Sequence, residues 1–143
     1  MIKSRGKDGF SGYILVLFLA IGLFVLLQEK NPGVKSITTD EAFQLIQRDT
    51  AVVLLDVRTI DEWNGPTGHL KNAILIPLQD LHGQINRLNS FRDKLIIVYC
   101  RSGNRSGVAA RILADTGINA VNLTGGIRGW TSRKYPVLRE NTE

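Results

Sequence analysis

Short apolar runs alternate with amphipathic stretches along most of this chain. Runs that are apolar at consecutive positions are typical of strands covered on both faces of a sheet. We expect strands at residues 36–38, 51–56, 73–76, 95–99 and 119–123. We expect helices at residues 41–47, with Thr39 or Asp40 as the cap, and at 78–88, 107–114 and 125–130. Strands that alternate with helices predict an α/β fold with an open, mostly parallel sheet and helices on both faces.

A longer apolar segment precedes this alternating pattern. Residues 9–28 carry no formal charge and have no polar face. A helix of this length spans a hydrocarbon core of about 30 Å. The sequence therefore predicts one transmembrane helix at 9–28, between a short basic tail at 1–8 and a linker at 29–36. A cleavable secretory signal is the alternative, but no small-residue cleavage site follows, so we favour an uncleaved signal-anchor.

The positions of charged residues predict how the chain is oriented in the membrane and which partners it favours. Lys3, Arg5 and Lys7 precede the apolar segment, and Lys30 and Lys35 follow it. The positive-inside rule therefore predicts a single-pass protein of the cell membrane with its domain on the extracytoplasmic side. The whole chain has 18 Lys and Arg against 13 Asp and Glu, without a dense basic stripe interleaved with aromatic residues. This pattern does not favour a nucleic-acid partner.

Cys100 is the only cysteine and follows the predicted strand at 95–99 directly. A single cysteine excludes an intrachain disulfide. Ligands of open parallel sheets bind at the carboxyl ends of the strands, where this thiol is expected to lie. Loop N–H groups, the N-terminus of the next helix, Arg101 and Arg105 would all lower its pKa. The sequence therefore predicts a thiolate nucleophile.

The residues after Cys100 form a candidate anion-binding loop. Gly103 permits a positive φ that lets the loop close, and the serine and asparagine side chains can donate to oxyanions. The predicted binding residues are Arg101, Ser102, Gly103, Asn104, Arg105 and Ser106. Four residues separate Cys100 from Arg105, one fewer than in cysteine phosphatases. This smaller cradle suits a single sulfur atom better than a phosphate. No residues have metal-ligand spacing.

Four segments in order resemble the motifs of the rhodanese (sulfurtransferase) family. They are residues 54–58 with Glu62 and Trp63, residues 68–73 with 76–77, residues 98–106, and residues 123–130. The region 37–140 therefore resembles a single rhodanese domain, which implies the rhodanese-like fold. Residues 64–67 depart from the family pattern by a longer turn, which we expect to affect a loop and not the site.

The resemblance implies a sulfurtransferase. Cys100 would take sulfane sulfur from a small anionic donor such as thiosulfate, forming a persulfide, and pass it to a thiophilic acceptor. The acceptor would be cyanide or a thiol, including a protein thiol, and no cofactor is implied. Two alternatives remain. One is a cysteine-dependent phosphatase or arsenate reductase using the same loop, and the other is a non-enzymatic, membrane-tethered interaction module.

Other polar and aromatic residues have structural interpretations. We expect Arg58 to pair with Asp56, Glu62 or loop carbonyls. His69 is expected to satisfy backbone groups and not to act as a base. The two tryptophans, Trp63 and Trp130, are expected to pack in the core or at its edge.

Overall fold

The computed structural model describes residues 33–48 and 51–139. The basic tail, the predicted transmembrane helix at 9–28 and residues 29–32 of the predicted linker lie outside the described residues. Among the helices of the described part, none has the length and apolar character needed to cross a membrane.

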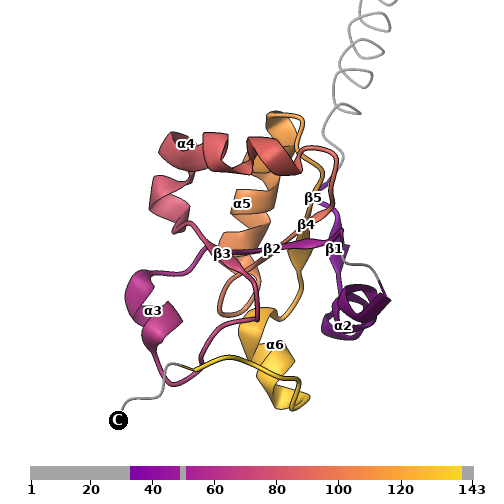
Figure 1. Ribbon diagram of the computed structural model, residues 1–143, viewed down its shortest axis with the longest axis vertical. Helices are drawn as coiled ribbons and strands as arrows, with labels where there is room; N and C mark the ends of the chain where they lie inside the picture. Colours follow the sequence, from indigo (N-terminus) through magenta and orange to yellow (C-terminus); the bar gives the residue numbers. More distant parts are fainter. Residues whose placement is uncertain (1–32, 49–50, 140–143) are drawn as a thin grey trace, which may run out of the picture. The chain divides into compact units, whose positions relative to one another are not determined.

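Five short parallel strands form one sheet (Figure 1). They are β1 (Ser36–Ile37), β2 (Val53–Asp56), β3 (Ile74–Leu75), β4 (Ile96–Tyr99) and β5 (Ala120–Leu123). The strand order is β1-β5-β4-β2-β3, and each neighbouring pair is parallel. The expected α/β architecture is confirmed, and the strand that precedes Cys100 lies at the centre of the sheet.

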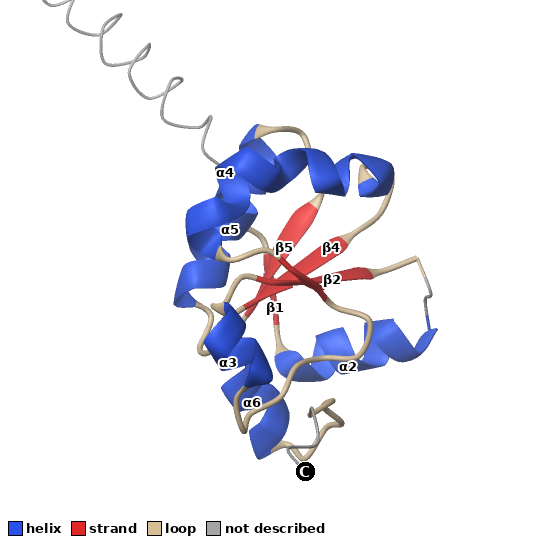
Figure 2. Cartoon of the chain, turned by 60° about the vertical axis from the view of Figure 1, so that its left-hand side comes forward, coloured by secondary structure: helices blue, strands red, loops and turns tan. Residues whose placement is uncertain are grey.

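Helices cover both faces of the sheet (Figure 2). They are α2 (Thr39–Arg48), α3 (Ile60–Asn64), α4 (Leu81–Gln84), α5 (Asn104–Asp115) and α6 (Gly126–Ser132). In β4, Ile96 and Val98 join the core cluster that includes residues of α4 and α5, whereas Ile97 and Tyr99 join the cluster of α2 and α6. This alternation explains why the strand is apolar at every position. Cys100 follows the alternation of Ile96 and Val98 and belongs to the same core cluster, which includes residues of α5.

The segment expected as one helix at 78–88 forms three short helical pieces instead. The 3₁₀ segments η1 (Leu78–Asp80) and η2 (Ile85–Phe91) flank the single turn α4. No side chain caps the start of any of the three pieces, and Gly83 lies in the middle of α4. A glycine in a helix interior and a missing cap both weaken a regular α-helix.

Helix α2 begins with a different cap from the one expected. The Glu41 N–H donates to Thr38 Oγ1 at 3.3 Å, and the Thr38 N–H donates to the Glu41 carboxylate at 2.7 Å. This reciprocal pair is a capping box, so Thr38 caps α2 in place of Thr39 or Asp40. Thr39 is instead buried, and its hydroxyl donates to the Thr124 carbonyl at 3.3 Å.

The helix after Cys100 starts earlier than expected. It begins at Asn104 and not at 107, after Gly103 as the N-cap residue. Gly103 has φ +107, a conformation that residues with a side chain rarely adopt. The expectation of a positive φ at this position is confirmed. As a result, Arg105 and Ser106 belong to the first turn of α5.

Candidate active site

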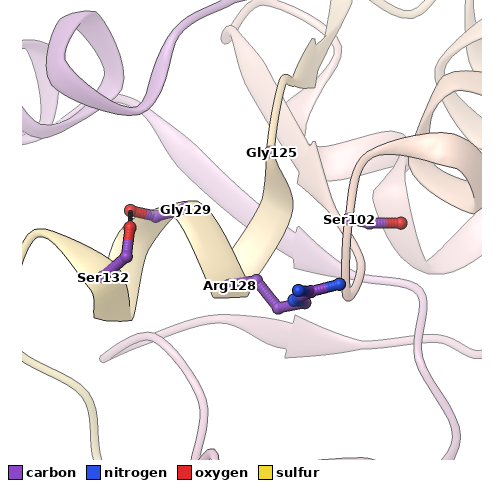
Figure 3. Close-up of a pocket in the computed structure, with 5 residues that line it drawn as sticks. All are labelled: Ser102, Gly125, Arg128, Gly129 and Ser132. Carbon is purple, nitrogen blue, oxygen red and sulfur yellow. Dashed lines mark hydrogen bonds between the residues drawn. The ribbon is translucent and has the colours of Figure 1, made fainter.

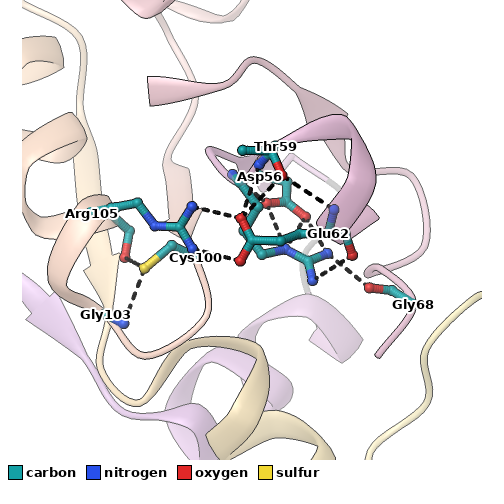
Figure 4. A network of polar contacts seen from close by, with 9 residues as sticks. Asp56, Thr59, Glu62, Gly68, Cys100, Gly103 and Arg105 are labelled. Carbon is teal, nitrogen blue, oxygen red and sulfur yellow. Dashed lines mark hydrogen bonds and ion pairs between the residues drawn. The ribbon is translucent and has the colours of Figure 1, made fainter. Parts of the chain in front are cut away.

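Cys100 lies at the carboxyl end of the central strand, inside a tight turn. Its side chain is nearly buried, at 1% exposure. The Gly103 N–H donates to Cys100 Sγ at 3.2 Å, and Ser106 Oγ lies 3.4 Å from the same sulfur. In Figure 4 a dashed line joins the Gly103 nitrogen to the sulfur of Cys100. The turn therefore surrounds the sulfur with hydrogen-bond donors.

These donors favour the thiolate. Burial opposes ionisation of Cys100, but hydrogen bonds from the Ser106 side chain and from loop N–H groups outweigh it, and its pKa is lowered. The contributing N–H groups belong to Ser102, Gly103 and Ser106. The predicted direction of the shift is confirmed. The pKa is lowered mainly by hydrogen bonds from neighbouring groups of the turn, whereas we had also expected a contribution from the charges of Arg101 and Arg105.

Asn122 of β5 competes for the Ser106 hydroxyl. Ser106 Oγ lies 2.7 Å from Asn122 Oδ1 as well as 3.4 Å from the sulfur. A hydroxyl has one hydrogen and can donate it to only one of these acceptors at a time. A thiolate accepts more strongly than a neutral thiol, so ionisation of Cys100 draws this hydrogen toward the sulfur. Sequence reasoning missed Asn122, which is 16 positions away from Ser106.

The start of α6 closes the other side of the turn. The N–H groups of Ile127 and Arg128 donate to the carbonyl oxygens of Cys100 and Arg101, at 2.9 and 3.1 Å. Gly126 makes this approach possible, because a Cβ there would contact Cys100 O and would lie 2.7 Å from the Arg101 carbonyl carbon. The carbonyl groups of the turn are thus occupied by α6, while the Gly103 N–H is directed to the sulfur.

Arg105 is paired with a carboxylate. Its Nη1 and Nη2 atoms donate to Oε2 and Oε1 of Glu62 in α3, each at 2.7 Å (Figure 4). The Arg105 hydrogen bond is the largest cause that lowers the pKa of Glu62, to about 2. Both side chains are about one-third exposed. The sequence predicted Arg105 as a binding residue but missed this partner.

A buried ion pair between Asp56 and Arg58 is hydrogen-bonded to α3. Arg58 is 1% exposed and Asp56 is fully buried, and their closest N–O distance is 2.7 Å. Arg58 also donates to the carbonyl oxygens of Glu62 and Gly68, at 3.1 and 2.8 Å. The predicted structural role of this pair is confirmed. Through Arg58, the end of β2 is connected both to α3 and to the loop that contains Gly68.

The remaining predicted residues lie around the mouth of the turn. Arg101, Ser102 and Asn104 are exposed, whereas Gly103 and Ser106 are buried. Ser102 lines a cavity with Gly125, Arg128, Gly129 and Ser132. In Figure 3 the Arg128 side chain extends from α6 toward the turn that carries Ser102.

Arg101 lines a second cavity, on the side of α3. Its other walls include Arg58, Asp61 and Glu62, and the turn residues Gly65, Pro66 and Thr67. The departure from the family pattern at 64–67 was expected to leave the site untouched, but three of its residues form a wall of this cavity. Within residues 33–48 and 51–139, no group of three His, Cys, Asp or Glu is placed to hold a metal ion.

The aromatic residues named from the sequence have packing roles. Trp130 is buried at 4% exposure, and its indole N–H donates to the Pro136 carbonyl at 2.9 Å. Trp63 stacks on His69, with ring centroids 3.7 Å apart. The backbone of His69 forms an antiparallel bridge with Leu138. These contacts confirm core or edge packing for both tryptophans.

The family model for the rhodanese-like domain matches residues 38–133. The chain belongs to the rhodanese-like family. YibN of Escherichia coli (strain K12), a relative named as uncharacterized, is 33% identical over 94% of this chain and 93% of its own length. YtwF of Bacillus subtilis, named as a candidate sulfurtransferase, is 30% identical over 72% of this chain and 96% of its own length. YrkF of Bacillus subtilis (strain 168), named as a candidate sulfur carrier protein, is 32% identical over 73% of this rhodanese-like chain, which spans about half (55%) of the length of YrkF.

Solved structures of rhodanese-like proteins share this fold. A rhodanese-related protein from Thermoplasma volcanium has 36% identity and a TM-score of 0.67, covering 74% of this chain and 99% of its own. A rhodanese-like domain protein from Staphylococcus aureus has 33% identity and a TM-score of 0.64, covering 73% and 98%. A protein from Rhodopseudomonas palustris, titled as a possible tyrosine phosphatase, has 21% identity and a TM-score of 0.67, covering 96% of this chain and 100% of its own. At that identity the similarity shows the fold alone.

Proposed function

We propose that this rhodanese-like protein is a sulfurtransferase that carries sulfane sulfur as a persulfide on Cys100. The observation that supports the proposal most directly is the environment of the thiol. Its sulfur lies 3.2 Å from the Gly103 N–H and 3.4 Å from the Ser106 hydroxyl, and its pKa is lowered. Such an environment favours an anionic sulfur as nucleophile and as carrier.

The first step loads the protein. The Cys100 thiolate attacks the outer sulfur of a donor such as thiosulfate, and a new S–S bond forms. The S–S bond of thiosulfate breaks, and sulfite leaves with the bonding electron pair. The product on the protein is a persulfide anion, which the same N–H groups stabilise. The exposed Arg101 beside the turn attracts the anionic donor.

The second step discharges the protein. A thiophilic acceptor, cyanide in an assay or a thiol in the cell, attacks the terminal sulfur of the persulfide. The S–S bond to Cys100 breaks, and the thiolate is regenerated. Cys100 is the only cysteine of the chain, so the sulfur must pass to another molecule. YrkF and YtwF, whose names refer to a sulfur carrier and a sulfurtransferase, support this reaction class.

The size of the turn disfavours the phosphatase alternative. Only four residues separate Cys100 from Arg105, the Gly103 N–H is directed at the sulfur itself, and the Ser106 hydroxyl lies 3.4 Å from it. A bound phosphate needs several donors arranged around its oxygens. Arg105 is also already engaged by Glu62. These features suit the terminal sulfur of a persulfide better than a phosphate bound inside the turn.

The decisive experiment is intact-mass analysis of the full chain after treatment with thiosulfate. We expect a gain of one sulfur atom, about 32 Da, that disappears on addition of cyanide with formation of thiocyanate. Cys100→Ala is expected to gain no mass. Hydrolysis of p-nitrophenyl phosphate without any mass gain from thiosulfate would support the phosphatase. Absence of both activities would support the interaction module.

We also propose that residues 9–28 anchor the protein in the cell membrane as a single span, with the domain on the extracytoplasmic side. The support is the uncharged apolar sequence, and the similarity to YibN covers 94% of this chain and so includes most of that segment. Fusions of alkaline phosphatase and of green fluorescent protein after Glu143 test the topology. We expect the alkaline phosphatase fusion to be active and the green fluorescent protein fusion not to fluoresce. The reverse pattern overturns the proposed orientation. Recovery of the unfused chain in the soluble fraction overturns the anchor.

A further inference from the structure

The pair formed by Glu62 and Arg105 changes the charge available beside Cys100. Both oxygens of the Glu62 carboxylate accept from the guanidinium at 2.7 Å. The carboxylate is also held by its own helix, since its Oε2 accepts from the Thr59 N–H at 3.1 Å in a capping box. The Glu62 carbonyl accepts from the buried Arg58 at 3.1 Å. The carboxylate is therefore fixed in place, and the charge of Arg105 is compensated in the resting site.

The other charged side chains near the turn are Arg58, Arg101, Asp61 and Arg128, the last of which extends from α6 toward the turn that carries Ser102 (Figure 3). Arg58 is compensated by Asp56. Arg101 is exposed and, within the described residues, has no ion pair; it shares its cavity with Asp61 and Glu62. A donor with one negative charge is attracted by Arg101. Because Glu62 and Arg105 cancel each other's charge, a second negative charge on the donor finds no free Arg105 and lies in the cavity that Asp61 also lines.

We propose that Glu62 is a specificity-determining residue that neutralises Arg105 and thereby makes the Cys100 site favour monoanionic sulfur donors over dianionic ones. Glu62 acts through Arg105 and touches neither the reacting sulfur nor the bond that breaks, so it is a positioning residue. Its pKa of about 2 keeps the carboxylate charged throughout the physiological pH range. This inference rests on the sulfurtransferase function proposed above.

Two donors of nearly the same shape allow the test. Thiosulfate is a dianion, and methanethiosulfonate is a monoanion in which a methyl group replaces one charged oxygen. In both, the Cys100 thiolate attacks the outer sulfur, and the donor S–S bond breaks. The leaving group is sulfite in one case and methanesulfinate in the other, each departing with the bonding electrons. The protein is left with the same persulfide, so cyanide discharge is common to both reactions.

Glu62→Gln removes the charge and keeps the cap, because glutamine also serves at this position of a capping box. The measured quantity is the ratio of kcat/KM for thiosulfate to kcat/KM for methanethiosulfonate, with KM and kcat resolved separately. For the full chain with Glu62→Gln, we expect the ratio to rise roughly three- to tenfold through a lower KM for thiosulfate. Arg105→Gln is expected to lower the ratio by a similar factor, because the Glu62 charge is then uncompensated.

The double variant Glu62→Gln/Arg105→Gln is the matched control. It carries no net charge at this position, so its ratio should return to within about twofold of the wild-type value. An unchanged ratio in Glu62→Gln overturns the inference. A parallel loss of kcat with both donors also overturns it, since Glu62 would then only support the turn. The sulfurtransferase function fails in a different way, namely if the wild-type protein gains sulfur from neither donor.

Discussion

The backbone N–H of Ile127 donates a 2.9 Å hydrogen bond to the carbonyl oxygen of Cys100. This contact joins the first turn of α6 to the residue that carries the proposed nucleophile. It requires the two backbones to approach closely at Gly126, which has φ +55. The site is therefore closed by a segment that follows Cys100 by more than twenty positions.

Gly126→Ala is expected to destabilise the protein. A Cβ at this position would contact Cys100 O and Arg101, and the positive φ adds backbone strain. The expected loss in the free energy of unfolding is about 2–4 kcal/mol, measured by urea denaturation. Gly83→Ala is the control, because a Cβ there meets nothing within 4 Å. It should be neutral or stabilising by up to about 1 kcal/mol. Equal effects of the two substitutions would show that the close approach at Gly126 is unimportant.

Ser106→Ala is expected to raise the pKa of Cys100. Burial already opposes ionisation of the thiol, and the Ser106 hydroxyl is the largest of the contributions that offset it. The pH dependence of alkylation by iodoacetamide measures this pKa. Ser102→Ala is the matched control, since Ser102 acts on the thiol through its backbone N–H, which alanine retains. A shift of the same size in both variants would contradict a specific role for the Ser106 hydroxyl.

Glu62 should make stability depend on pH in the acid range. Its pKa is about 2 in the folded protein against a reference value of 4.5, chiefly because of Arg105. A depressed pKa means that ionised Glu62 stabilises the fold above pH 4.5 and loses this effect as the pH falls toward 2. The difference in Tm between the wild type and Glu62→Gln should therefore shrink over this window. A difference that is constant between neutral pH and pH 2 would show that the ion pair contributes nothing to stability.

A buried ion pair should contribute more to the free energy of unfolding than an exposed one, and the pairs Asp56–Arg58 and Asp40–Arg133 allow the comparison. Arg58→Leu leaves the buried Asp56 without its partner, and we expect a loss of about 3–5 kcal/mol in the free energy of unfolding. Arg133→Leu breaks the pair with Asp40, whose side chains are 43% and 50% exposed. That substitution should cost at most about 1 kcal/mol. Urea unfolding of both variants measures these losses. Similar losses in the free energy of unfolding would mean that the burial of Arg58 and Asp56 does not affect the contribution of their ion pair.

Much of the fold and the core of the site were predictable because they depend on local sequence. The consecutive apolar residues of β4 predicted a strand buried on both faces, and Cys100 follows it directly. Gly103 was expected at a positive φ from its place in a short turn, and Asp56, two positions away, was among the partners expected for Arg58, with Glu62 and loop carbonyls. Local rules were less accurate at helix ends, where Thr38 and Gly103 are the N-cap residues and the helices begin earlier than expected.

The sequence by itself therefore determined the alternation of strands and helices, the place of Cys100 after the central strand, and the turn that follows it. Only the tertiary structure decided which distant groups surround that turn. Glu62 and Arg105 are 43 positions apart, and Ser106 and Asn122 are 16 apart. These contacts depend on the strand order β1-β5-β4-β2-β3, which places β2 and β5 on either side of β4. Residues at the carboxyl ends of neighbouring parallel strands then meet at one edge of the sheet, and spacing along the chain contains no record of that proximity.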